Sequence, residues 1–129
     1  MRRDSLLLAT FAALEGAAGV AFAAAAAHAE GGANLATAAQ FLMIHAGAGL
    51  ALSGLSEKIA RPARWFSIAA FALQGGVALF SGALAAGVYG VKPFPYAAPI
   101  GGSTTILAWL ALAAFFATRR SSATGVDGA

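Results

Sequence analysis

Four apolar stretches are the feature of this sequence that most limits how it can fold. They run over residues 5–27, 34–55, 65–89 and 99–118, and the segments between them are short and rich in charged or turn-forming residues. A helix needs about 20 mostly apolar residues to cross the hydrocarbon core of a bilayer. Each stretch meets this requirement, so the sequence predicts a protein that crosses a membrane four times.

Helix is the expected state of all four stretches. Backbone groups inside lipid must be hydrogen-bonded within the protein, which leaves helices or closed barrels. Barrel strands alternate apolar and polar residues, and these stretches do not. Only 10% of the residues are charged, against about 25% in soluble domains. We therefore expect an all-α, four-helix transmembrane bundle over residues 1–120, followed by a disordered polar tail over residues 121–129.

The basic residues predict the orientation of the bundle. Seven of the eight fall on one side of the predicted membrane, and only Lys92 falls on the other; the seven are Arg2, Arg3, Lys58, Arg61, Arg64, Arg119 and Arg120. Segments rich in lysine and arginine stay in the cytoplasm. We therefore expect cytoplasmic termini and a multi-pass protein of the bacterial cytoplasmic (inner) membrane. This membrane role accounts for the net charge of +3, so no nucleic-acid partner is expected.

A cleaved signal peptide is the alternative interpretation of the N-terminus. Met1-Arg2-Arg3, the apolar run and the alanines before His28 resemble a secretory signal with a small-residue cleavage site. Glu15 within the apolar run argues against this, and the distribution of basic residues requires an even number of spans. We expect the first span to be retained.

Three polar residues lie at similar depths in the predicted spans. At about 1.5 Å per residue, Glu15, His45 and Gln74 all fall near the middle of the bilayer. Ionisable residues at this depth are costly and often functional. We therefore expect these side chains to form a buried polar cluster, and His45 to face the bundle interior with a partner on another helix, Glu15 or Gln74.

Two interpretations of this cluster are open. A carboxyl and an imidazole in contact could relay a proton or ion, or hold a ligand. Alternatively, the polar groups could simply bond between helices and fix their register. We favour the structural interpretation, because three polar groups in a small bundle need partners whether or not they carry chemistry.

The chain offers few other chemical groups. It has no cysteine, which excludes disulfides, thiolate metal sites and cysteine nucleophiles. Its two histidines, His28 and His45, have no recognisable metal-ligand spacing. No serine-histidine-acid pattern, dinucleotide fingerprint or phosphate loop is present. We expect neither an enzymatic activity nor a metal or other cofactor.

Four short motifs resemble a known family. They are Ala27-His28-Ala29, the stretch 37–46, Phe80-Ser81-Gly82, and Pro99-Ile100-Gly101-Gly102 followed by Trp109. In this order they resemble domain-of-unknown-function family 423, the small membrane proteins like transmembrane protein 256. The matching positions include His28, Thr37, Phe41, His45, Ser81, Gly82, Pro99, Gly101, Gly102 and Trp109. Glu15 is not part of the family pattern. The resemblance implies a four-helix inner-membrane or mitochondrial protein without an established activity.

These features predict a non-enzymatic subunit or assembly partner of a larger membrane complex, or a homo-oligomer within the lipid bilayer. Short loops leave little room for a soluble active site, and abundant small residues allow close packing against other helices. The alternatives are a conductor of protons, ions or small solutes, and a protein that binds a lipid, quinone or haem between its helices.

Overall fold

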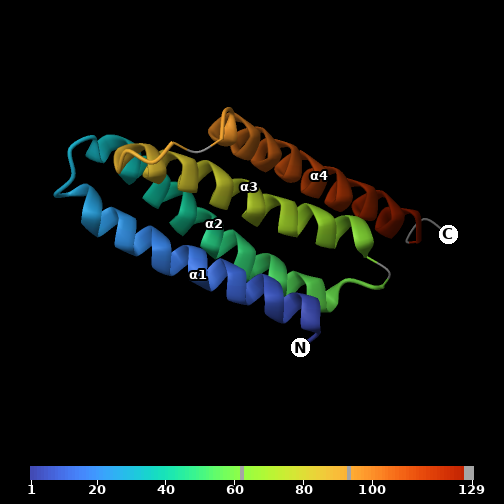
Figure 1. Cartoon of the computed structure of the whole chain (residues 1–129). Coiled ribbons are helices and arrows are strands. Elements are labelled where there is room, and N and C mark those ends of the chain that lie inside the picture. Colours follow the sequence, from blue (N-terminus) through green and yellow to red (C-terminus); the bar gives the residue numbers. More distant parts are fainter. Residues whose placement is uncertain (62, 93, 127–129) are drawn as a thin grey trace.

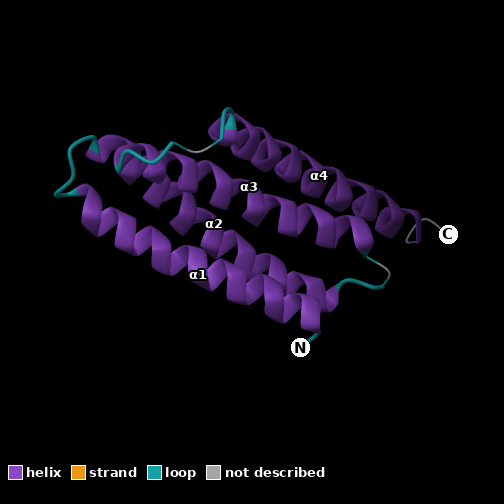
Figure 2. Ribbon diagram, viewed as in Figure 1, coloured by secondary structure: helices purple, strands orange, loops and turns teal. Residues whose placement is uncertain are grey.

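The computed structural model describes residues 1–61, 63–92 and 94–126 of the chain. This part of the chain forms four helices and no strands: α1 (Arg3–Ala26), α2 (Gly32–Lys58), α3 (Arg64–Val88) and α4 (Ala97–Val126) (Figures 1 and 2). Each helix is long and apolar enough to cross a membrane. The prediction of an all-α fold with four spans is therefore confirmed.

The fourth helix is longer than its predicted span. α4 continues to Val126, so the predicted disorder is not observed over residues 121–126, and residues 127–129 of that tail lie outside the described residues. The sequence after Arg120 contains no proline, and no glycine before Gly125. Extending a formed helix adds one backbone bond per residue and is cheap compared with starting one, so the helix runs on past the apolar stretch.

The turn between α1 and α2 depends on a pair of glycines. Gly31 has a φ of 73°, in the left-handed region that side chains disfavour. A Cβ atom at Gly32 would collide with the carbonyl oxygen of Ala26. The Gly31-Gly32 pair thus lets α2 reverse directly onto α1.

The helices pack in sequence order, each antiparallel to the one before. α1 lies along α2, α2 along α3 and α3 along α4 (Figure 1), while α1 touches α3 over a shorter length. Within the described residues, α4 makes no close backbone contact with α1 or α2. In α1 and in α4, 22% of the residues in the 18-residue apolar stretch are buried inside the bundle. In α2 and in α3 the corresponding share is 44%. α2 and α3 are therefore the central pair, and α1 and α4 are the outer helices.

α1 begins and α4 ends at the same end of the bundle (Figure 1). Asp4 forms an ion pair with Arg61, and Arg2 lies 3.9 Å from the carboxylate of Glu57. These contacts tie the N-terminus to the connection between α2 and α3. The fold therefore gathers basic residues from the N-terminus and the α2–α3 connection at one end.

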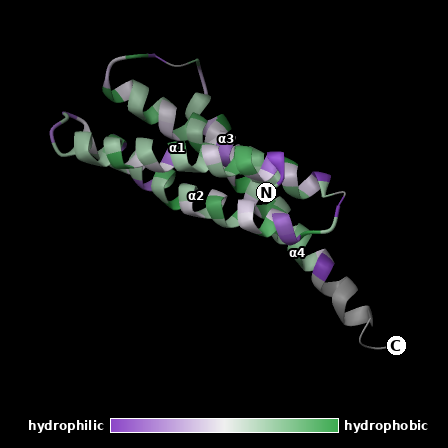
Figure 3. Cartoon of the chain, turned by 90° about the horizontal axis from the view of Figure 1, so that it is seen from below, coloured by the Kyte–Doolittle hydropathy of each residue, from purple (hydrophilic) through white to green (hydrophobic). Residues whose placement is uncertain are grey.

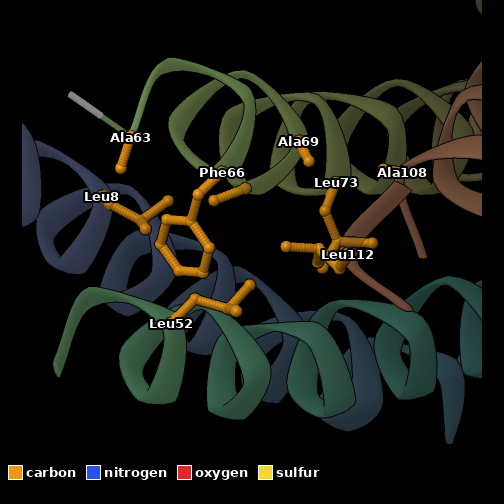
Figure 4. Packing of buried hydrophobic residues seen from close by; sticks show 9 residues of the cluster. Leu8, Leu52, Ala63, Phe66, Ala69, Leu73, Ala108 and Leu112 are labelled. Atoms are coloured by element: carbon orange, nitrogen blue, oxygen red, sulfur yellow. The ribbon is translucent and has the colours of Figure 1, made fainter. Parts of the chain in front are cut away.

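A compact apolar cluster near that end holds all four helices together (Figure 4). Phe66 of α3 is 1% exposed and lies between Leu8 of α1 and Leu52 of α2, and Leu112 of α4 packs beside Leu73. Most residues of the helices are hydrophobic (Figure 3), and many large apolar side chains are exposed on the outside of the bundle. Such a surface fits hydrocarbon and would be unfavourable in water.

Candidate functional site

The three residues of the predicted polar cluster are all buried. Glu15 of α1 is 5% exposed, His45 of α2 is 7% exposed and Gln74 of α3 is fully buried. Their side chains nevertheless form no hydrogen bond with one another. The cluster is therefore a set of separate polar groups, each with its own environment.

The imidazole of His45 is held from both sides. Its Nδ1 lies 2.7 Å from the carbonyl oxygen of Phe41, and the indole Nε1 of Trp109 lies 3.2 Å from its Nε2. Because an indole N–H can only donate, Nε2 accepts and Nδ1–H donates to Phe41. The expected interior position and inter-helix bond of His45 are confirmed, but the partner is Trp109 of α4. Neither expected partner, Glu15 or Gln74, bonds the ring, which turns toward α4; Gln74 bonds only the backbone carbonyl of His45.

Gln74 contacts His45 through the backbone. Its amide nitrogen donates to the carbonyl oxygen of His45 at 2.9 Å. Gly49 makes this bond feasible, because a Cβ there would collide with the Gln74 amide and lie 2.7 Å from the Cβ of Ala12. Gln74 thus bonds α3 to α2, as an inter-helix polar contact would, while its side-chain oxygen has no partner among the described residues.

Glu15 has no hydrogen-bond partner for either carboxyl oxygen within the described part of the chain. Its side chain lines a groove of about 240 Å³ between α1, α2 and α3, here called the Glu15 groove. The groove is lined by Phe11, Leu14, Glu15, Ala18, Phe22, Leu42, Ala78 and Gly82. Glu15 is the one polar side chain among these lining residues, and the others are apolar.

Several family-motif residues form one aromatic cluster. The ring of Phe41 lies 5.8 Å from His45 and 4.8 Å from Phe80, and His45 lies 5.9 Å from Trp109. Motifs on α2, α3 and α4 therefore meet around His45. Hydropathy and spacing could not have predicted this, because aromatic residues also occur widely on the lipid-facing surface.

The glycine motif at the start of α4 lies where α3 and α4 approach most closely. A Cβ at Gly101 would be 2.5 Å from the backbone nitrogen of Phe80 and 2.7 Å from the carbonyl oxygen of Gly76. A Cβ at Gly76 would be 2.9 Å from the carbonyl oxygen of Gly101. Thr105 donates to that same carbonyl at 2.9 Å. These glycines serve packing, as close backbone approach between membrane helices requires.

The remaining motif residues do not join the His45 cluster. His28 is exposed in the turn after α1, and Thr37 donates to the carbonyl of Ala33 in its own helix at 3.0 Å. Ser81 is fully buried, and its hydroxyl has no partner among the described residues. Gly82 lines the Glu15 groove, and Pro99 is exposed. A Cβ added at Gly102 would lie 3.7 Å from the ring of Phe80.

Replacing Trp109 with phenylalanine should leave His45 Nε2 without its donor. Inter-helix polar bonds in membranes contribute about 0.6 kcal/mol on average and at most about 1.7 kcal/mol. We therefore expect Trp109→Phe to lower the free energy of unfolding in mixed micelles by about 1 kcal/mol and to shift the ¹⁵N resonance of His45 Nε2. Trp65→Phe is the control, since Trp65 is 77% exposed. An unchanged Nε2 resonance in Trp109→Phe would contradict the bond.

Acidic and histidine side chains are scattered over the described residues. Across residues 1–61, 63–92 and 94–126, no three histidine, cysteine, aspartate or glutamate side chains group closely enough to hold an ion. The arrangement instead offers one unpaired carboxyl beside an apolar groove and one fully bonded imidazole.

Comparison with known proteins gives one result. The family model described as a protein of unknown function (DUF423) matches residues 16–102. No curated protein and no solved structure matches the chain significantly. The match covers more than half of the chain and includes all of α2 and α3, the second half of α1 from Gly16 and the start of α4.

Proposed function

The chain belongs to the DUF423 family, and on this premise we propose that it is a non-enzymatic subunit or assembly partner of a membrane complex. The family description assigns no activity, so the proposal is supported by the geometry of the chain. Its main support is a long groove on the outside of the bundle, between α3 and α4.

This α3–α4 groove consists of two adjoining hollows of about 330 and 240 Å³ that share Trp65 and Ala111. On α4 it extends from Thr104 to Thr118, which is about 20 Å at the rise of an α-helix. It is lined by Trp65, Ile68, Ala69, Ala72, Thr104, Leu107, Ala108, Ala111, Ala114, Phe115 and Thr118. The groove is thus long and rich in alanine.

A transmembrane helix of a partner fits such a groove. Helices in lipid associate by close packing at small residues, since there is no hydrophobic driving force between them. Alanines along the groove allow this approach, and its length is comparable to that of a membrane span. Among the described helices, the backbone of α4 lies close to α3 alone, and α4 reaches α2 through side chains such as Trp109. Leu107 and Ala111, which line the groove, are exposed and can contact a partner.

Site-specific cross-linking tests the proposal. The chain has no native cysteine, so a single Ala111→Cys variant can carry a photo-reactive probe into the groove in native membranes. We expect one discrete cross-linked product of defined mass. Ala51→Cys is the matched control, because Ala51 is exposed on α2, outside the groove. No product at Ala111, or the same products from both positions, would contradict the proposal.

We also propose that both termini face the cytoplasm of a bacterial inner membrane. The support is the basic residues at one end of the bundle and the positive-inside tendency. Alkaline phosphatase fused after Glu30 or Lys92 should be active, and the same enzyme fused after Lys58 or Ala129 should be inactive. Activity at the Lys58 junction would reverse the assignment.

Proton or ion conduction gains no support from the contacts of His45. Both ring nitrogens of His45 are engaged, by Phe41 and Trp109. A relay with Glu15 would need one of these bonds to break.

A further inference from the structure

The Glu15 groove is separate from the α3–α4 groove and differs from it in chemistry. It lies between α1, α2 and α3, and its volume is about 240 Å³. An apolar cavity of about 150 Å³ is enough to hold benzene, so a substituted six-membered ring fits here. Phe11 and Leu14 line the groove and remain 40% and 63% exposed, so the groove opens to the outside of the bundle.

The carboxyl of Glu15 has no hydrogen-bond partner among the described residues, at a depth where water is scarce. Glu15 lies twelve residues after the start of α1 and eleven before its end, or about 18 and 17 Å along the helix axis. It is therefore near the middle of the span, out of reach of phospholipid head groups at the membrane surface. Its oxygens are covered by the bundle and have no partner among the described residues, while the same side chain lines the groove.

The number of hydrogen bonds that one carboxyl can form limits which polar group of a ligand can bind to Glu15. An ammonium has three donors, and Glu15 alone could not satisfy them in an otherwise apolar groove. A hydroxyl or carbonyl oxygen needs only one or two bonds, which a single carboxyl can supply. Phe11 and Phe22 add aromatic surfaces that favour a planar ring.

We propose that the Glu15 groove binds the ring of a lipid-soluble quinone or quinol. When the ring binds, the Glu15 side chain changes rotamer so that its carboxyl is hydrogen-bonded to a ring oxygen. The ring lies against the phenylalanines, and the hydrocarbon tail extends into the bilayer. Binding involves no electron transfer and does not depend on a partner in the α3–α4 groove.

Gly82 allows the groove to be blocked without disturbing the bundle. A Cβ added at Gly82 would have no neighbour within 4 Å, yet Gly82 lines the groove. Leucine at this position therefore fills ligand space. Ala78→Leu provides a second blocking variant on the same helix, one turn away.

The test is equilibrium binding of radiolabelled decyl-1,4-benzoquinone, and of its quinol, to the full chain in phosphatidylcholine nanodiscs. We expect saturable binding at one site per chain. Gly82→Leu and Ala78→Leu should each weaken binding at least about tenfold, and Glu15→Leu about tenfold, the effect of losing one hydrogen bond. Glu15→Gln keeps a bonding group and should stay within about threefold of the native chain.

Ala114→Leu is the matched control, since it fills the α3–α4 groove and should leave binding unchanged. Circular dichroism and size-exclusion profiles establish that each variant is folded. Absence of saturable binding to the native chain would overturn the proposal. So would full binding by both Gly82→Leu and Ala78→Leu, an equal loss in Ala114→Leu, or tighter binding of decylammonium than of the quinone and quinol.

Discussion

Replacing Glu15 with leucine should make the fold more stable, by about 1–3 kcal/mol. A buried polar group without a hydrogen bond costs about this much, and neither Glu15 oxygen has a partner among the described residues. Leucine has a similar volume and no polar atoms. The measurement is the free energy of unfolding in mixed micelles of increasing sodium dodecyl sulfate content.

Ala13→Leu is the control for this prediction. Ala13 is exposed on the same helix, and surface substitutions usually change stability by less than about 0.5 kcal/mol. A lower free energy of unfolding in Glu15→Leu would mean that the carboxyl has hydrogen-bond partners in the protein without a ligand.

A gain in stability would have a functional meaning. Residues that cost stability are commonly retained where they serve binding or catalysis. Glu15→Leu should therefore raise the free energy of unfolding of the bundle and at the same time weaken quinone binding. If the role of Glu15 were purely structural, Glu15→Leu would instead lower the free energy of unfolding.

Gly101→Ala should destabilise the contact between α3 and α4 by about 1–3 kcal/mol, the usual cost of overpacking. The added methyl would lie 2.5 Å from the backbone nitrogen of Phe80 and 2.7 Å from the carbonyl oxygen of Gly76. Backbone atoms of a helix cannot move aside alone, so the two helices must separate. Unfolding in mixed micelles measures this loss.

Gly75→Ala is the matched control for this substitution. A Cβ at Gly75 meets no atom within 4 Å, so it should only gain helix propensity, by at most about 1 kcal/mol. Equal stability of the two variants would contradict the close contact. Because the α3–α4 groove lies along the same pair of helices, Gly101→Ala should also reduce cross-linking from Ala111.

The sequence by itself determined the number, type and approximate positions of the helices. A bilayer accepts few backbone structures, and an uninterrupted apolar stretch of sufficient length leaves the helix as the reasonable choice. The burial of Glu15, His45 and Gln74 was predictable for a related reason, because polar groups at mid-span avoid lipid. The extension of α4 past Thr118 was missed, because hydropathy marks the end of the apolar stretch and not the end of the helix.

Only the tertiary structure decided which side chains meet. The pairing of His45 with Trp109, the Gln74 bond to a backbone carbonyl and the unpaired state of Glu15 depend on how each helix is rotated about its axis. Helical periodicity places residues on a shared face of one helix, but α4 is apolar on every side, so its sequence does not say which face turns inward. That rotation is set by close contacts between helices, such as Gly76 with Gly101, and these arise only when all four helices pack together.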